Sequence, residues 1–255
     1  MGNLFFIYEV HNGLLQINYY HDKILLTRER RMVMGILDSY IPLVEFLGQA
    51  LGKYCEVVLH DLTNAEHSIV AIANGHLSGR KVGGPATDFV LKLMQQEKQE
   101  QAQFVVDYHG KASNGHIFRS SSYFIKDADG TVVGVLCLNY DVQPYLDARA
   151  MIDENILHGL HVDDFAPQEP VPRQPVKAVE TLYKTAGDTI TNMIAKRLAA
   201  YPVAPDRLSM DERVQLIENL NQDGLFLLKG GIPILAETLG VSEPTIYRYL
   251  NRIRH

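Results

Sequence analysis

Residues 232–255, IPILAETLGVSEPTIYRYLNRIRH, carry the strongest structural pattern in the chain. A helix-turn-helix needs a small residue where its first helix crosses the second, a turn residue that tolerates positive φ, and apolar positions that hold the two helices at a steep angle. Ala236 is the small residue and Gly240 is the turn residue. The apolar positions are Leu235, Leu239, Val241, Ile246 and either Tyr249 or Leu250. The segment therefore predicts a helix-turn-helix.

The residues at the helix boundaries support this prediction. Ser242 caps the second helix, and Pro244 is tolerated in its first turn because the amide at that position has no partner within the helix. Upstream, Ser209 and Glu212 have the spacing of a capping box and open a helix over residues 210–221. That helix would be the supporting first helix of a three-helix unit.

The outward side of the second helix has the chemistry of a DNA-reading surface. Arg248 can bond a guanine edge through two hydrogen bonds, Asn251 an adenine, and Glu243 a cytosine amine. Arg252 and Arg254 lie toward the far end, where phosphate contacts are the commoner role. A helical hairpin without a DNA partner is the alternative. The residues predicted to face DNA are Ser242, Glu243, Thr245, Tyr247, Arg248, Asn251 and Arg252.

The N-terminal half predicts a different kind of fold. Apolar residues recur at helical spacing over residues 28–51, where Pro42 marks a bend or break and Gly52 follows the last turn. Strand-like runs follow, and a further helical stretch lies between the second and third of them. These runs cover residues 55–62, 68–74, 103–109, 116–127 and 131–141. Asp-Gly at 129–130 predicts a tight hairpin. The order predicts an α+β domain with an antiparallel sheet and helices on one face.

Four segments organise the chain. We expect an N-terminal extension over residues 1–30, a sensor domain over 31–160 that closes with a helix over 145–160, and a linker over 161–178 that its prolines hold semi-extended. The remainder, 179–255, contains a helix at 179–200 and the helix-turn-helix. This helix is either a connector or a dimerisation helix, or it packs on the C-terminal module.

Composition places the chain among ordinary globular proteins, and its charge is divided unevenly. The 255 residues include 24 Lys and Arg against 30 Asp and Glu, a formal net charge of −6. From Lys177 onward there are ten Lys and Arg against nine Asp and Glu, which leaves 14 against 21 for the preceding part. A DNA-binding module attached to an acidic domain that does not touch phosphates gives such a split.

Several classes of protein are excluded by what the sequence lacks. No run is long and apolar enough for a membrane span, and no secretory signal opens the chain, so we expect a cytoplasmic protein. No metal-finger spacing, phosphate loop or nucleophile motif occurs. Cys55 and Cys137 lie in apolar runs and are interpreted as reduced core residues rather than a redox pair. We therefore expect no enzyme activity, no metal and no cofactor.

Four motifs together resemble the bacterial YheO/DauR-type transcriptional regulators. They are YCEVVLHDL at 54–62, IANGHLSGRKVGGPATD at 72–88, GVLCLNYD at 134–141 and GVSEPTIYRYLNRIR at 240–254, and the resemblance covers residues 34–254. It implies a YheO-like PAS domain followed by a helix-turn-helix, homodimers that bind operator DNA, and control of amino-acid catabolic genes in some members.

A pocket for a small-molecule effector should involve polar residues in apolar or glycine-rich surroundings. The glycines of the 79–85 loop permit unusual backbone torsions, which would let Arg80 or free amides approach a small anion. The alternative is a tight structural connection, with Thr87 and Asp88 capping the next helix and Arg80 paired to an acid. No axial ligand or reactive cysteine suggests a haem or flavin. The candidate ligand residues are His60, Asn74, Arg80, Thr87, Asp88 and Asn139.

Three other functions compete with a ligand-responsive regulator. An enzyme acting on a small substrate would use His60, Asp61, Arg80 and Asp88, but the sequence has no catalytic motif. A DNA recombinase would need a catalytic serine domain, which the strand-rich N-terminal region does not offer. A dimerisation scaffold that spaces two DNA-binding heads without sensing anything remains open.

Overall fold

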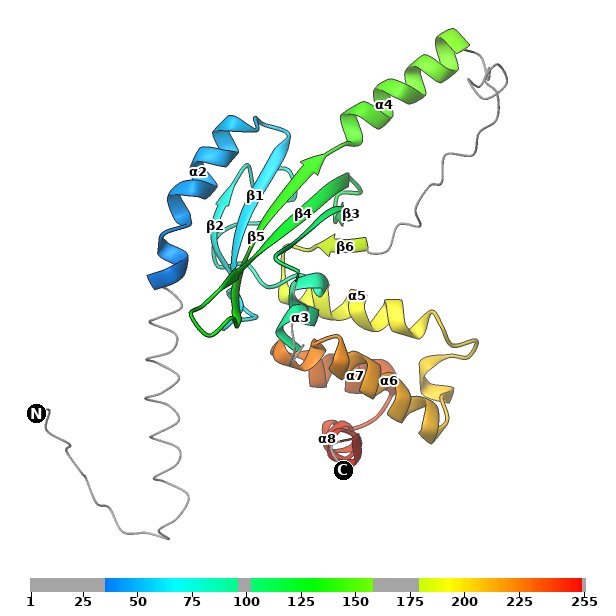
Figure 1. Cartoon of the computed structure of the whole chain (residues 1–255). Helices are drawn as coiled ribbons and strands as arrows, with labels where there is room; N and C mark the ends of the chain where they lie inside the picture. Colours follow the sequence, from blue (N-terminus) through cyan, green and yellow to red (C-terminus); the bar gives the residue numbers. More distant parts are fainter. Residues whose placement is uncertain (1–34, 96–101, 158–178, 254–255) are drawn as a thin grey trace, which may run out of the picture.

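The computed structural model describes residues 35–95, 102–157 and 179–253. These residues form a six-stranded sheet and a helical C-terminal head (Figure 1). The strands are β1 (Cys55–Asp61), β2 (Ile69–Ala73), β3 (Phe104–Ala112), β4 (Ile117–Lys126), β5 (Val132–Asp141) and β6 (Val179–Leu182). Their order across the sheet is β2-β1-β5-β4-β3-β6.

The sheet is mixed rather than purely antiparallel. The first five strands pair antiparallel, as predicted, and Gly130 adopts a φ of 82° in the hairpin between β4 and β5. β6 pairs parallel with β3, with Gly110 opposite Glu180. The expected helix at residues 179–200 is therefore wrong over its first residues, because Val179–Leu182 is the edge strand. The helix α5 begins at Ala186 (Ala186–Leu198).

The first described helical segment is broken, as Pro42 predicts. Residues 35–38 are helical, a turn follows, and α2 (Ile41–Ala50) begins with Pro42 in its first turn. α2 covers one face of the sheet, where Leu37 and Val44 pack against Val57 and Leu59 of β1. This face forms one apolar core.

The opposite face of the sheet is also covered, which corrects the expectation of helices on one face only. Alternation along β1 turns Glu56, Val58 and His60 away from α2, and all three are buried. The chain from β2 to α3 (Asp88–Gln95) closes this second face, with Leu93 packed near Val58. A strand buried on both faces therefore carries apolar side chains on one side and mostly polar ones on the other.

The C-terminal head is a set of short helices packed around one core. After α5 come η3 (Pro205–Arg207), α6 (Met210–Gln222), η4 (Leu225–Leu227), α7 (Gly231–Leu239) and α8 (Glu243–Ile253). The predicted capping box at Ser209 and Glu212 is present at the start of α6. Val90 and Leu91 of α3 belong to the same apolar core as the head, so the N-terminal sheet domain and the head pack on each other through α3.

The helix after the sheet extends away from the rest of the protein (Figure 1). α4 (Gln143–Ile152) has no buried residue and continues as a π-helical turn, η1 (Asp153–Leu157). The expected N-terminal extension over residues 1–30 and the proline-rich linker over 161–178 lie outside the described residues.

Candidate DNA-reading surface and buried sensor cluster

The recognition helix α8 is set by its turn and its apolar stripe. Gly240 ends α7 with a φ of 64°, and the amide of Val241 donates to the carbonyl of Ala236 at 3.0 Å. Ile246, Tyr249 and Leu250 are buried in the head core. These contacts fix which side of α8 faces outward, as the sequence predicts.

The predicted DNA-facing residues lie on the outer side of α8. Six are exposed, and the side chain of Thr245 is half-buried. The Ser242 and Thr245 hydroxyls lie 3.0 Å apart at the start of the helix. Arg248 and Asn251 point away from the apolar stripe, which leaves their donors free to meet base edges. The exposed residues are Ser242, Glu243, Tyr247, Arg248, Asn251 and Arg252.

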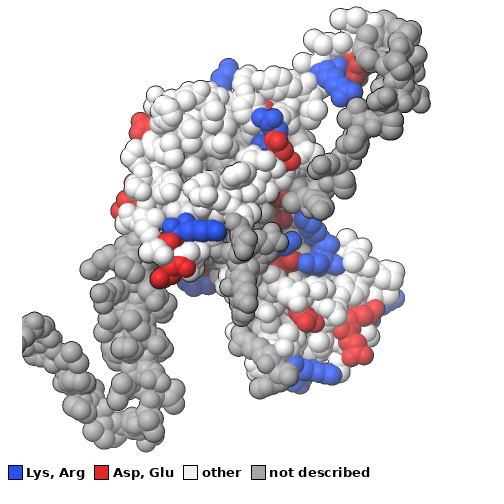
Figure 2. All heavy atoms as spheres, viewed as in Figure 1, with Lys and Arg blue, Asp and Glu red and all other residues white. Residues whose placement is uncertain are grey.

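The surface charges do not form a broad basic patch on the face shown in Figure 2. Lys and Arg side chains are scattered there among Asp and Glu, and both signs lie together where the head meets the sensor sheet. Nonspecific phosphate binding needs a cluster of cations. The face shown in Figure 2 therefore lacks such a cluster.

A row of polar side chains crosses the second face of the sheet. Strand register places Glu56 of β1 opposite Asn139 of β5, and Asn139 opposite Ser120 of β4. Ser120 in turn lies opposite Tyr108 of β3. Each of these side chains is buried. Buried polar groups are costly unless they are paired, so this row must form a hydrogen-bonded cluster.

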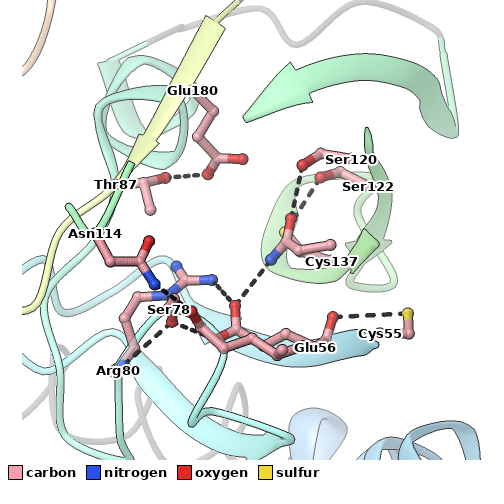
Figure 3. A network of polar contacts seen from close by, with 12 residues as sticks. Cys55, Glu56, Ser78, Arg80, Thr87, Asn114, Ser120, Ser122, Cys137 and Glu180 are labelled. Carbon is pink, nitrogen blue, oxygen red and sulfur yellow. Dashed lines mark hydrogen bonds and ion pairs between the residues drawn. The ribbon is translucent and has the colours of Figure 1, made fainter. Parts of the chain in front are cut away.

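An ion pair lies at one end of the cluster (Figure 3). Arg80 Nη2 approaches Glu56 Oε1 at 2.5 Å, and both side chains are almost completely excluded from solvent. Ser78 donates to the other carboxylate oxygen of Glu56, and Asn139 donates to Oε1 at 3.2 Å. Arg80 Nη1 is buried without a hydrogen-bond partner in the described part of the chain. Both carboxylate oxygens of Glu56 thus accept hydrogen bonds, whereas Nη1 of the Arg80 guanidinium has no acceptor among the described residues.

A second carboxylate, Glu180 of β6, lies at the other end. Thr87 Oγ1 donates to Glu180 Oε1 at 2.5 Å, and the Tyr108 hydroxyl donates to Oε2 at 2.9 Å. Burial raises the pKa of Glu180 despite the nearby Arg80 charge. The pKa of Tyr108 is also raised well above its usual value, first by burial and then by Glu180.

The candidate ligand residues divide into two groups. Arg80, Asn139 and Thr87 belong to the cluster. Asn74 does not, because its amide donates to the carbonyls of Gly48, Gly52 and Cys55 at 2.8–3.1 Å and ties α2 to β1. The ring of His60 lies 3.0 Å from the Ser68 hydroxyl, and Asp88 accepts from the Thr181 amide at 3.0 Å.

His60 is buried on the same sheet face, and its ring lacks one hydrogen-bond partner among the described residues. Burial lowers the pKa of His60 well below its usual value, and its Nε2 atom has no hydrogen-bond partner among the described residues. The imidazole is therefore neutral at physiological pH. It is a packed polar residue next to the cluster rather than a cation within it.

Six of the nine side chains of the cluster were not predicted from the sequence. Glu56 lies between Cys55 and Val57 in β1, so a period of two would have turned it away from the apolar face. Ser120 and Ser122 share one face of β4 by the same period, but Arg119 and Ser121 beside them left no apolar contrast. Glu180 gave no such signal because its strand was interpreted as a helix. The missed members are Glu56, Ser78, Tyr108, Ser120, Ser122 and Glu180.

The two cysteines are buried free thiols, as expected. Burial raises the pKa of Cys55 to about 11 and that of Cys137 to about 12. The Ser122 hydroxyl lies 3.1 Å from the sulfur of Cys137. Neither thiol has the thiolate character that a nucleophile needs.

Two polar cavities lie where α3 meets the head. One, of about 440 Å³, is lined by Lys92, Gln95, Asn221, Gln222 and Asp223. The other, of about 170 Å³, is lined by Asp88, Lys92, Met193, Lys196, Arg197 and Asp223. Among the described residues, no group of His, Cys, Asp and Glu has the arrangement of a metal site, and no helix is long and apolar enough to cross a membrane.

Comparison with known proteins gives a family match for each of the two parts of the chain. The family model of the YheO-like PAS domain matches residues 31–156, and that of a helix-turn-helix domain matches residues 189–251. A protein of Haemophilus influenzae, described as uncharacterised, is 29% identical over 225 residues, 86% of this chain and 92% of its own length.

Two named relatives each match this chain over 219 residues. YheO of Escherichia coli K12 is 25% identical over 219 residues, 86% of this chain and 85% of the relative. The transcriptional regulator DauR of Pseudomonas aeruginosa is 23% identical over 219 residues, 86% of this chain and 94% of the relative.

The fold and the outward face of α8 define a DNA-binding regulator of the helix-turn-helix class with a PAS-like domain. More particularly, the chain is of the YheO/DauR type, with a YheO-like PAS domain followed by a helix-turn-helix domain.

Proposed function

We propose that this protein is a ligand-responsive transcriptional regulator that reads operator DNA with α8. The observation that carries the proposal is the division of α8 into a buried stripe and an exposed face bearing Arg248 and Asn251. These two side chains pair with guanine and adenine through two hydrogen bonds each. Glu243, Thr245 and Tyr247 would add base or phosphate contacts, and Ser242 and Arg252 would hold phosphates.

The buried cluster is the proposed sensor site. An ion pair and a second carboxylate inside a small domain cost free energy, and replacing such groups by apolar ones is often neutral or stabilising. Their presence around Arg80, Asn139 and Thr87 therefore favours a role beyond stability. A small polar molecule that offers an acceptor to Arg80 Nη1 would relieve an unsatisfied donor. A scaffold that senses nothing is the competing proposal.

We propose that the protein acts as a homodimer in the cytoplasm. A single helix-turn-helix contacts few base pairs, and dimers of such proteins bind two half-sites about one helical turn apart. Both matched domains are of regulator type, so we assign no catalytic reaction to the cluster. Amino-acid catabolic genes are the targets expected from the resemblance to the YheO/DauR-type regulators.

Selection of bound fragments from random-sequence DNA tests the proposal. We expect the wild-type chain to enrich an inverted repeat. Arg248→Ala should weaken binding to that sequence by about 1–3 kcal/mol and relax the preference at one base in each half-site. The matched control is Arg149→Ala, which removes an arginine of similar exposure from α4. Enrichment of no sequence, or an equal effect of both substitutions, would contradict DNA reading by α8.

Ligand sensing has its own test on the full chain. Thermal shift against a panel of amino acids and related small carboxylates should reveal a compound that stabilises the protein and changes operator affinity. Ser78→Ala and Asn139→Ala should reduce the shift, because both side chains hold Glu56 in place. A panel with no stabilising compound would favour the scaffold.

A further inference from the structure

The sensor and the DNA-binding head are joined by more than chain connectivity. Leu91 of α3 is fully buried in the core that also contains the head helices. A Cβ atom on Gly224, at the end of α6, would lie 2.8 Å from the carbonyl oxygen of Leu91. The backbone of α3 is therefore in close contact with the head, and the fit tolerates no side chain at this point.

Ion pairs lie along the edge of this contact, which we call the seam, while the centre of the contact is the shared apolar core. Lys92 of α3 lies 3.4 Å from Asp223 at the end of α6, and Arg197 of α5 binds the same carboxylate with bonds of 2.6 and 2.7 Å. Lys196 of α5 lies 3.6 Å from Asp88. The two polar cavities described above flank these pairs, so water reaches the seam.

The first turn of α3 is attached to the buried cluster at two consecutive residues. Thr87 donates to Glu180 and also accepts from the amide of Val90, so the same hydroxyl caps α3 and touches the cluster. Asp88 accepts from the amide of Thr181. Thr87, just before α3, and Asp88, its first residue, are thus bound to two adjacent residues of β6.

β6 leads directly into the head. Three residues, 183–185, separate its last residue, Leu182, from the start of α5. Thr185 then caps α5 by accepting from the amide of Asp188 at 3.1 Å. Any shift of β6 against the cluster would therefore be passed to α5 through the chain and to α6 through α3.

From these contacts we propose that α3 and β6 relay the state of the Glu180 carboxylate to the recognition helix. While Thr87 and Tyr108 hold this carboxylate, α3 is seated on the head and α8 is presented in its DNA-binding position. A ligand that takes the carboxylate away from Thr87 removes one of the two bonds that tie the start of α3 to β6, which lets α3 shift on the head. The inference rests on the proposed function, because it explains how the sensor would govern DNA binding.

Two substitutions of Glu180 distinguish the relay from general destabilisation of the protein. Glu180→Met removes both acceptor oxygens but leaves Thr87 free to cap α3. Glu180→Gln is the matched control, because its amide oxygen still accepts a hydrogen bond. In hydrogen–deuterium exchange of the full chain, Glu180→Met should raise the exchange of α3 and of α5 to α8 by about threefold to tenfold, which is the loss of one or two hydrogen bonds. Exchange in β1 and β2 should stay at the wild-type rate, and Glu180→Gln should match wild type throughout.

The second measurement is of DNA binding. Fluorescence anisotropy gives the affinity of each protein for the DNA sequence that the wild-type chain selects. Glu180→Met should reduce this affinity by about threefold to tenfold, and Glu180→Gln should not. Failure of the wild-type chain to select any sequence would refute the proposed function. The hydrogen–deuterium exchange of the variants would still test the relay.

Two results would overturn the relay. One is faster exchange throughout the sheet and head alike, which would indicate general destabilisation. The other is unchanged exchange in the head. Should Glu180→Met fail to fold, Thr87→Val and its control Thr87→Ser, which keeps the hydroxyl, replace it in the same two measurements. The same expectations apply to this pair.

Discussion

The buried ion pair between Arg80 and Glu56 gives the clearest expectation for a single side chain. Arg80→Met leaves the Glu56 carboxylate in the protein interior without its cation, which typically costs about 3–5 kcal/mol. Arg119→Met breaks a pair with Asp107 whose two side chains are mostly exposed, and should cost less than about 1 kcal/mol. Urea denaturation of both variants measures the difference. Equal losses of unfolding free energy in the two variants would show that the buried Arg80 pair matters no more to stability than an exposed pair.

The raised pKa of Glu180 predicts a pH dependence with a definite sign. Because burial raises this pKa above the ordinary value of 4.5, the folded chain binds the proton more tightly than the unfolded chain. The stabilisation is complete below pH 4.5 and is lost as the pH rises through the folded-state pKa.

Comparison with Glu180→Gln isolates this contribution from that of other groups. The free energy of unfolding of wild type, minus that of the variant, should fall with rising pH by at most about 1.4 kcal/mol per pH unit. Chemical denaturation at a series of pH values from 4 upward gives this difference. A difference that stays constant or increases with pH would contradict a raised pKa.

Substitutions at two glycines test the turn of the helix-turn-helix and the contact between α3 and the head. Both have positive φ, 64° for Gly240 and 82° for Gly224. An added Cβ on Gly240 meets nothing closer than 3.9 Å, so Gly240→Ala should cost only the backbone penalty of about 1–2 kcal/mol. Gly224→Ala adds a clash with the Leu91 carbonyl and should cost about 2–5 kcal/mol in total. Thermal denaturation of the two variants tests the ranking, and a larger loss for Gly240→Ala would contradict the seating of α3.

The elements that were predicted correctly have signals within their own residues. β1 and β5 are apolar runs bounded by turns, Ser209 and Glu212 cap α6 locally, and Gly240 lies where the chain must adopt positive φ. Each signal depends on near neighbours in the sequence. Local chemistry therefore predicted the first five strands and the helix-turn-helix.

β6 could not be found in this way, because its structure is imposed from outside. Residues 179–182, VETL, precede α5 without a proline between them and share its apolar spacing. Their strand conformation comes from pairing with β3, in which Gly110 lies opposite Glu180. The Thr87–Glu180 contact joins residues 93 positions apart, so the second carboxylate of the candidate sensor site lies on an element that only the tertiary structure reveals.

The shared core predicts how the sensor and head unfold together. Leu91 and Val90 of the sensor lie in the same apolar core as Leu216 and Leu235 of the head. We expect one cooperative transition in calorimetry, with equal calorimetric and van't Hoff enthalpies. Near-ultraviolet and far-ultraviolet signals should change at the same temperature. Two separate transitions would mean that the head and sensor are independent and would remove the basis for the relay.

Genome-wide footprinting of the wild-type chain and of Arg248→Ala examines DNA reading in the cell. The wild-type protein should protect promoter sites that share an inverted repeat, with half-sites about one helical turn apart. Arg248→Ala should lose most of these sites while Arg149→Ala keeps them. Absence of a shared sequence, or the same protected sites in all three proteins, would contradict recognition of DNA by α8.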